Sequence, residues 1–228
     1  MRAILLGLTC LLMGLSGCTR PVAPKEAAFL QELTGGQIEV SRMRIHPGLP
    51  SLSRKSPPSK RLTCVSRIYP PQTDPNRRAA SPGMTLWNTV LIRSDWHAPS
   101  MVGDWPRELD LTRALLLSHE ALHVWQWQQR ALTGYSPFRA FGEHFASADP
   151  YLFDTKTKAE FFSFGYEQQG AIIEEYLCCR LLAPKSDRSQ RLHAMLSQVL
   201  PLSPLEKPLA QSVILPWRGV KLDGICDG

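Results

Sequence analysis

The chain has 228 residues, of which 43% are hydrophobic and 20% are charged, and its formal net charge is +6 at pH 7. These values are typical of a globular protein, so they exclude a chain that is disordered throughout. With this composition, no part of the chain after the first residues needs to be a membrane-spanning segment. The length after residue 17 is enough for a single core of ordinary size, and we expect one folded domain.

The first residues have the pattern of a lipoprotein signal. Arg2 is followed by an apolar run over residues 3–12 and then by Leu-Ser-Gly-Cys at residues 15–18, a run too short for a comfortable membrane span. The last four residues resemble the lipobox of bacterial lipoproteins, in which the cysteine is lipidated and becomes the first residue after cleavage. The resemblance implies that residues 1–17 are removed and that Cys18 carries the lipid. The alternative is an ordinary secretory signal in which the cysteine is incidental.

This resemblance also implies a location in the bacterial cell envelope. Because Thr19 follows the cysteine in place of an aspartate, the outer membrane, facing the periplasm, is the expected destination in a Gram-negative host. The membrane would then be one partner of the protein, through its N-terminal lipid.

Residues 18–61 have the composition of a tether and a basic, proline-rich linker. A short helix is predicted over residues 27–34, stopped by Gly35 and Gly36. Residues 42–78 hold nine basic residues, one acidic residue and seven prolines, which favours an extended, solvated segment that can touch anionic lipid. We expect no nucleic-acid partner, because aromatic residues are nearly absent from this stretch.

The remaining elements predict a small α+β domain over residues 62–228, mainly α, in which two long helices pack on a short sheet. Strands are predicted over 62–69 and 84–92 from their β-branched and apolar residues. A long helix is predicted from the N-cap Asp110 to about residue 132, where Gly134 follows. A second long helix is predicted over 157–182 and a third over 186–200.

The first long helix contains His119-Glu-Ala-Leu-His123, an H-E-x-x-H motif. Histidines four residues apart share one helical face, where both can bind one Zn²⁺, and Glu120 projects beside the ion. From there Glu120 can act as a general base toward a water molecule. The alternative is a pair of histidines hydrogen-bonded in the core, with no metal.

Two histidines leave a zinc site one protein ligand short. On the second long helix, glutamates recur every seven residues near one apolar stripe, and the loop before it offers a histidine and an aspartate. The candidates for the third ligand are Glu160, Glu167, Glu174, His144 and Asp149.

The residues around the motif exclude one family of zinc metallopeptidases and resemble another. The metzincin pattern requires a glycine and a histidine where this chain has Gln126 and Gln129. By contrast, H-E-A-L-H-V-W-Q and the later Y-E-Q-Q-G-A-I-I-E-E-Y resemble the gluzincin-type, zincin-like metallopeptidase domains of bacterial secreted and contractile-injection-associated proteins. The resemblance covers roughly residues 83–182.

This resemblance implies a zinc metallopeptidase that hydrolyses peptide bonds in a peptide or protein substrate, with Zn²⁺ held by His119, His123 and Glu167. Glu174 is the alternative third ligand, and the glutamate that is not a ligand would orient a histidine. The chain departs from the family at Gly170, where alanine is usual.

The resemblance also implies that the strand 84–92 is an edge strand above the histidine helix that binds an extended substrate. Tyr166, Tyr151 and His144 are available as donors to the oxyanion of a transition state. Two other interpretations stay open: a non-catalytic scaffold lipoprotein of the same fold, and a helical interaction domain without metal.

Four cysteines remain after the signal and the predicted lipid site: Cys64, Cys178, Cys179 and Cys226. The periplasm is oxidising, so disulfides are allowed. The adjacent pair is not expected to bridge within a helix, whereas a bridge from one of the two to Cys64 or Cys226 is geometrically reasonable. Without a C-x-x-C motif, a cysteine zinc site is not expected.

Overall fold

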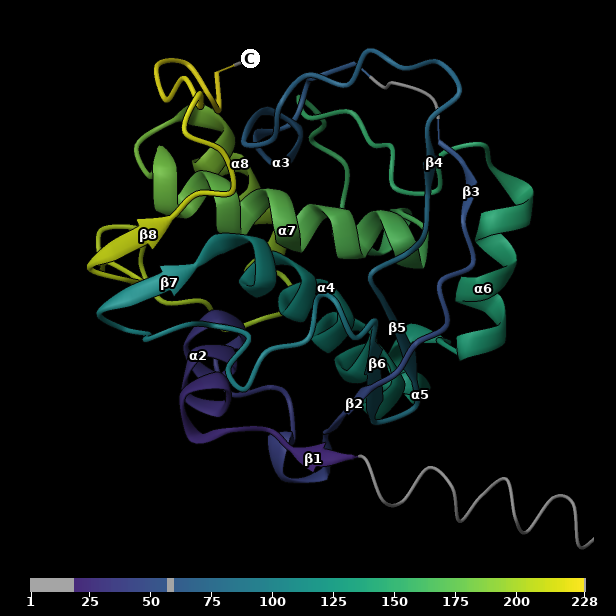
Figure 1. Ribbon diagram of the computed structural model, residues 1–228. Coiled ribbons are helices and arrows are strands. Elements are labelled where there is room, and N and C mark those ends of the chain that lie inside the picture. Colours follow the sequence, from purple (N-terminus) through teal and green to yellow (C-terminus); the bar gives the residue numbers. More distant parts are fainter. Residues whose placement is uncertain (1–18, 57–59, 228) are drawn as a thin grey trace, which may run out of the picture.

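The computed structural model describes residues 19–56 and 60–227, which form a mixed α+β fold (Figure 1). The predicted signal peptide and the predicted lipidation site, Cys18, lie outside the described residues. Within the described residues, no helix is both long and apolar enough to cross a membrane.

Two long helices, α4 and α7, pack against each other at the centre of the molecule, and shorter helices surround them (Figure 1). The α-helices are α2 (Pro24–Thr34), α3 (Cys64–Arg67), α4 (Leu111–Gln128), α5 (Arg130–Thr133), α6 (Pro137–Ala146), α7 (Tyr166–Leu182) and α8 (Asp187–Leu196), with 3₁₀ turns η1 (Val40–Arg42) and η2 (Phe161–Ser163).

The main sheet has the strand order β1-β2-β6-β5, so β5 is one of its edges. Strand β6 pairs parallel with β2 and antiparallel with β5. Two smaller sheets pair β3 with β4 and β7 with β8. The strands are β1 (Arg20–Pro21), β2 (Arg44–Pro47), β3 (Arg54–Lys55), β4 (Arg78–Ala79), β5 (Gly83–Leu86), β6 (Thr89–Ile92), β7 (Glu108–Asp110) and β8 (Ser212–Ile214).

Residues 19–56, predicted to be a tether and linker, contribute directly to the core. Phe29, Leu30 and Leu33 of α2 are fully buried, and β2 lies inside the main sheet. The predicted helix at 27–34 is confirmed as α2, and Gly35 ends it in the left-handed region with φ 61°. The expectation of an extended linker is wrong here, because the prolines stand where they interrupt neither element. Pro24 lies in the first turn of α2, where no backbone N–H is needed, and Pro47 is the last residue of β2.

The predicted strand at 62–69 is wrong, because this segment forms the short helix α3. Thr63 caps it by accepting a hydrogen bond from the backbone N–H of Ser66 at 3.0 Å. A buried carboxylate, that of Glu175, accepts from the backbone N–H groups of Cys64 and Val65. Contacts from a distant helix therefore outweigh the local preference for a strand.

The predicted strand at 84–92 is a hairpin of two strands, β5 and β6. The turn between them is Trp87-Asn88, and Trp87 adopts a φ of 55°, in the left-handed region. Asn88 is a typical turn residue, but the bulky Trp87 beside it masks the turn in the sequence pattern.

The predicted helix over 110–132 is confirmed as α4 and α5, with Asp110 accepting a hydrogen bond from Arg113 N–H at 3.1 Å. The second long helix is confirmed in part: α7 begins at Tyr166, nine residues after the predicted start. The third helix is confirmed as α8 but ends at Leu196. Helix α6 lies where the sequence pattern predicts a loop.

Candidate metal centre

The two histidines of the H-E-x-x-H motif lie one turn apart on α4, on the face that packs against α7. Their Nε2 atoms are 3.2 Å apart. His119 is 6% exposed and His123 is 3% exposed. Two imidazoles buried in this way need polar partners, because an unsatisfied buried polar group destabilises the fold.

Glu167, in the first turn of α7, reaches these histidines. Its Oε2 atom lies 3.2 Å from Nε2 of His119 and 3.6 Å from Nε2 of His123. The start of α7 is set by Glu143 of α6, whose carboxylate accepts from the backbone N–H groups of Tyr166 and Glu167. The structure therefore brings the three predicted metal ligands together in a buried group.

The spacing of the three donor atoms can be tested against zinc geometry. Four atoms bound tetrahedrally at zinc–nitrogen and zinc–oxygen distances lie about 3.3 Å from one another. The observed separations of 3.2, 3.2 and 3.6 Å match the edges of such a tetrahedron. The three residues therefore fit three of the four ligand positions around a zinc ion.

The hydrogen bonds of His123 leave the correct nitrogen free to bind a metal. Its Nδ1–H donates to Oε1 of Gln126 at 2.7 Å. The amide of Gln126 donates in turn to Gln169 at 2.8 Å, and Gln169 donates to the backbone carbonyl of Phe164 at 2.8 Å. This buried chain fixes the protonated nitrogen as Nδ1, so the lone pair of Nε2 faces Glu167.

Glu174 lies near Nδ1 of His119, as Gln126 lies near Nδ1 of His123. Its Oε2 atom lies 3.6 Å from Nδ1 of His119, on the side of the ring away from Glu167. It is the alternative third ligand, and the structure places it where a partner that orients the imidazole is expected. The sequence pattern does not assign Gln126 and Gln169 to the site. The signal that could have identified them is that each is a polar amide among apolar residues of a long helix.

The electrostatic field of the group favours a cation. Burial lowers the pKa of His119, but the carboxylates of Glu174 and Glu167 raise it by more, so it lies well above its ordinary value. Burial raises the pKa of Glu167, but His123, His119 and His144 lower it by more, so the net shift is downward. A field that stabilises positive charge on imidazole also stabilises a metal cation at the same place.

Glu120 contacts strand β5. It is 5% exposed, and Thr85 of β5 donates a hydrogen bond to its Oε2 atom at 2.8 Å. A Cβ atom on Gly83 would lie 2.6 Å from Oε1, so any larger residue there would require the Glu120 carboxylate to shift. Burial raises the pKa of Glu120, although His119 and His123 partly oppose the shift. Edge strand β5 therefore lies beside the motif.

The predicted oxyanion donors have different surroundings. The Tyr166 hydroxyl donates to the backbone carbonyl of Thr133 at 3.2 Å, so it is already engaged. His144 lies with its Nε2 atom 3.3 Å from Oε1 of Glu167. The Tyr151 ring is 5.7 Å from the ring of His119. Of the three, Tyr151 has no hydrogen bond from its hydroxyl within the described part of the chain, and burial raises the pKa of this hydroxyl.

Tyr135 also belongs to the site and was missed by sequence reasoning. It stacks on His123 at 5.6 Å between ring centroids and is 3% exposed. Burial raises its pKa, so the phenol stays protonated. The signal in the sequence is its position directly after Gly134, which ends α5 in the left-handed region.

Two of the third-ligand candidates lie elsewhere. Glu160 is exposed and precedes η2. The carboxylate of Asp149 accepts a hydrogen bond from the backbone of Tyr151 at 3.2 Å, within its own loop. Neither is part of the buried group formed by the two histidines and Glu167.

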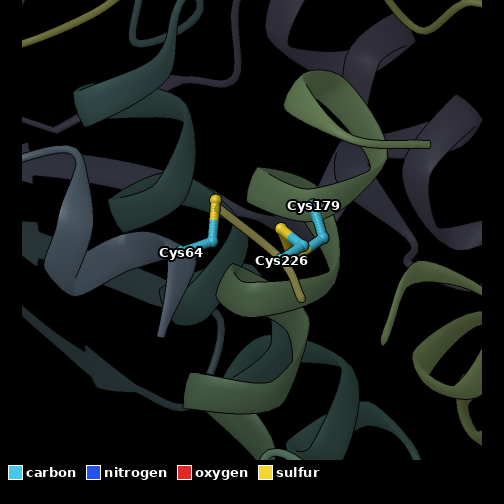
Figure 2. A group of neighbouring side chains, drawn as sticks. All are labelled: Cys64, Cys179 and Cys226. Atoms are coloured by element: carbon cyan, nitrogen blue, oxygen red, sulfur yellow. A yellow bond between two sulfur atoms is a disulfide. The ribbon is translucent and has the colours of Figure 1, made fainter. Parts of the chain in front are cut away.

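The four cysteines form two disulfides, Cys64–Cys178 and Cys179–Cys226. The expectation that the adjacent cysteines bridge outward, and not to each other, is confirmed. Figure 2 shows that three of these sulfurs lie close together at α7. Because each sulfur is already bonded to another, these residues offer no thiolate to a metal.

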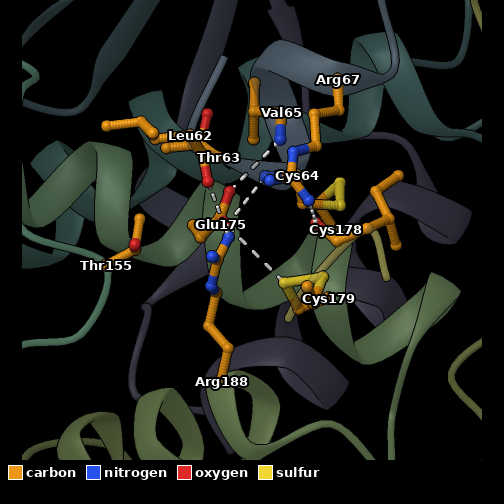
Figure 3. A network of polar contacts seen from close by, with 12 residues as sticks. Leu62, Thr63, Cys64, Val65, Arg67, Thr155, Glu175, Cys178, Cys179 and Arg188 are labelled. Atoms are coloured by element: carbon orange, nitrogen blue, oxygen red, sulfur yellow. Dashed lines mark hydrogen bonds and ion pairs between the residues drawn. A yellow bond between two sulfur atoms is a disulfide. The ribbon is translucent and has the colours of Figure 1, made fainter. Parts of the chain in front are cut away.

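A buried ion pair accompanies the disulfides (Figure 3). Arg188 of α8 donates to Oε1 of Glu175 at 2.7 Å, and both side chains are nearly inaccessible to solvent. The same carboxylate accepts from the backbone of α3. This end of α7 is therefore fixed by covalent and ionic contacts to α3, α8 and the C-terminal segment.

The comparisons with known proteins add one distant similarity. No protein-family model matches the chain, and no curated protein matches it. Among solved structures, it is similar to the effector domain of Pseudomonas aeruginosa VgrG2b, with a TM-score of 0.48 and 17% sequence identity. The alignment covers 87% of this chain and 96% of that domain. A similarity this distant carries no argument about activity.

Proposed function

We propose that this protein is a zinc-dependent metallopeptidase of the gluzincin type. The observation that carries the proposal is the buried group of His119, His123 and Glu167, whose donor atoms are spaced as the corners of a zinc tetrahedron. Three protein ligands and one open position are typical of catalytic zinc, whereas structural zinc has four protein ligands. When bound, zinc supplies a Lewis acid that polarises a carbonyl group and makes water acidic.

Other residues of the chain transfer the proton, orient the ligands and bind the oxyanion. Glu120 accepts the proton of the attacking water at its carboxylate and delivers it to the leaving amine. Thr85 holds one oxygen of that carboxylate by its hydrogen bond at 2.8 Å, so Oε1 is the oxygen available for the proton. Glu174 and Gln126 orient the imidazoles of His119 and His123 through their Nδ1 atoms. Tyr151 is the candidate donor to the developing oxyanion.

The edge strand β5 supports a substrate that binds in extended form. One side of β5 pairs with β6, and the other side is not paired with a strand of the main sheet. An extended peptide can add to such an edge through backbone hydrogen bonds. Because Thr85 of β5 touches Glu120, a peptide bound along this strand would lie close to the general base.

The burial of the donor atoms favours a second candidate, a zinc-containing scaffold of the same fold without turnover. His119, His123 and Glu167 are each less than a tenth exposed. A scaffold has no need of a carboxylate at Glu120, so the two candidates differ in what that residue does.

The decisive experiment compares the wild type with Glu120→Gln and with Glu160→Gln as a matched control. Glu160 is exposed and outside the buried group, so its substitution should change nothing. We expect both variants to bind one zinc per chain, and only Glu120→Gln to lose cleavage of a mixed peptide library, by at least about a hundredfold. Equal cleavage by Glu120→Gln and the wild type would contradict the role of Glu120 as the general base. Zinc binding with no cleavage by the wild type would favour the scaffold.

We further propose that the protein is anchored in the bacterial cell envelope by a lipid on Cys18, as the lipobox-like sequence implies. Labelling of the full chain with a radioactive fatty acid in a bacterial host tests this. Label in the wild type and none in Cys18→Ser is the expected result, and label in both would contradict the assignment.

A further inference from the structure

Helix α6 presents an aromatic face to solvent. Phe138, Phe141 and Phe145 are 78%, 49% and 72% exposed, and their spacing of three and four residues puts them on one face of the helix. The buried residues of α6 are Pro137 and Ala140. Exposed aromatic residues gathered in this way are typical of a binding surface, whereas single exposed apolar residues are common everywhere.

This aromatic face is continuous with the candidate metal centre. The Tyr151 ring lies 5.7 Å from the ring of His119 and 5.7 Å from the ring of His144. His144 is 6.3 Å from Phe141, and Phe141 is 5.1 Å from Phe145. A row of neighbouring rings therefore leads from a predicted metal ligand to the surface of α6.

The far end of the row is basic. The guanidinium of Arg54 lies over the Phe145 ring at 5.3 Å. Arg54 and Lys55 form β3, which pairs with Arg78 of β4 and runs beside α6 (Figure 1). In residues 19–56 and 60–227, none of these three basic side chains forms an ion pair. Their positive charge is therefore available to an acidic ligand.

We propose that this aromatic–basic strip, formed by Tyr151, His144, Phe141, Phe145 and Arg54, is the part of the protein that selects its substrate. The substrate it fits is an extended polypeptide segment with aromatic or large aliphatic side chains near the cleaved bond and acidic side chains several residues farther along. The inference rests on the proposed peptidase function, because it assigns the strip to the substrate of that centre.

The expected effects follow from the area and charge involved. Covering a half-exposed phenylalanine ring with an apolar side chain strengthens binding by about tenfold. The contribution of Arg54 is smaller, about two- to fivefold, because it is exposed, and it should disappear as salt is raised. The contributions of the phenylalanines and of Arg54 to binding can therefore be distinguished, because only that of Arg54 depends on salt.

The test measures binding and cleavage separately. Fluorescence anisotropy measures the affinity of labelled peptides for the full chain carrying Glu120→Gln. This variant is used so that the peptides are not cleaved during the binding measurement. Three peptides are compared: one with phenylalanine and aspartate, one with serine in place of phenylalanine, and one with lysine in place of aspartate. The first should bind at least about tenfold more tightly than the second. Phe141→Ser with Phe145→Ser should remove that preference, and Arg54→Glu should remove the preference for aspartate.

Matched controls carry the same chemical changes elsewhere on the surface. Leu222 is 47% exposed and Arg218 is exposed, and both lie in the C-terminal segment, outside the strip. Leu222→Ser and Arg218→Glu should leave all three affinities unchanged. If the controls reduce binding as much as the strip variants do, the proposal is wrong.

Two further outcomes would overturn the proposal. One is equal binding of all three peptides. The other is binding of the strip to vesicles of anionic phosphatidylglycerol, lost in the same variants, with no preference among peptides; the surface would then be a membrane contact. Selective binding without cleavage by the wild type would refute the peptidase but leave the strip as a peptide-binding surface, so the two failures are distinguishable.

Discussion

Gly170 gives the sharpest test of the geometry around His119. It lies on α7 one turn after Glu167, and a Cβ atom added to it would be 2.4 Å from Cε1, 2.6 Å from Nε2 and 2.7 Å from Nδ1 of the imidazole. Carbon and nitrogen atoms that are not bonded normally stay about 3.5 Å or more apart. In Gly170→Ala the ring must therefore move by roughly 1 Å.

Such a movement has unequal effects on stability and on metal binding. Overpacking of this kind costs about 1–3 kcal/mol, and the better helix propensity of alanine offsets about 1 kcal/mol, so the free energy of unfolding should fall by no more than about 2 kcal/mol. Zinc ligands tolerate deviations of only about 0.2 Å. A donor displaced by several times that distance should lower zinc affinity by about a hundredfold or more.

Competition with a chromophoric zinc chelator measures the affinity, and urea unfolding of the metal-free chain measures the stability. Gly142→Ala is the matched control, because a Cβ atom at this α6 position meets no atom within 4 Å. It should leave zinc affinity unchanged and stabilise the fold by up to about 1 kcal/mol. If Gly170→Ala binds zinc as tightly as the wild type, His119 is not held as a ligand against α7.

Three other changes have expected outcomes. Glu174→Ala should lower zinc affinity by about tenfold without removing binding, because it frees the His119 ring to rotate; an unchanged value in the chelator assay would refute this role. Replacing both Cys179 and Cys226 by serine should lower the free energy of unfolding by about 4 kcal/mol, since the disulfide closes a loop of 47 residues. Glu175→Ala should cost about 3–5 kcal/mol in urea unfolding, because it withdraws the carboxylate from buried Arg188.

The histidine helix was predictable because its signals are local. Asp110 supplies the N-cap, the apolar residues of α4 recur at helical spacing, and Gly134 ends α5 in the left-handed region. Each of these features depends on residues only a few positions apart. The two histidines therefore share a face for reasons that need no knowledge of the rest of the fold.

The segments that were predicted wrongly depend on distant contacts. Helix α3 forms where a strand was expected, because Glu175 accepts its first backbone N–H groups from 111 and 110 residues away. Helix α7 starts at Tyr166, well after the predicted start, because Glu143 of α6 receives the first N–H groups of the helix. Neither partner can be identified from spacing along the chain, since nothing in the sequence states which carboxylate faces which helix.

The same reasoning explains why periodicity alone cannot choose between Glu167 and Glu174 as the third ligand. Both glutamates lie on one stripe of α7, and a periodic pattern treats them equally. What distinguishes them is the approach of α7 to α4 at Gly170, which lies between the two and allows His119 to rest directly on the helix backbone. With the ring in that position, one edge faces Glu167 and the other faces Glu174. Gly170 therefore gives the two carboxylates different places around one imidazole.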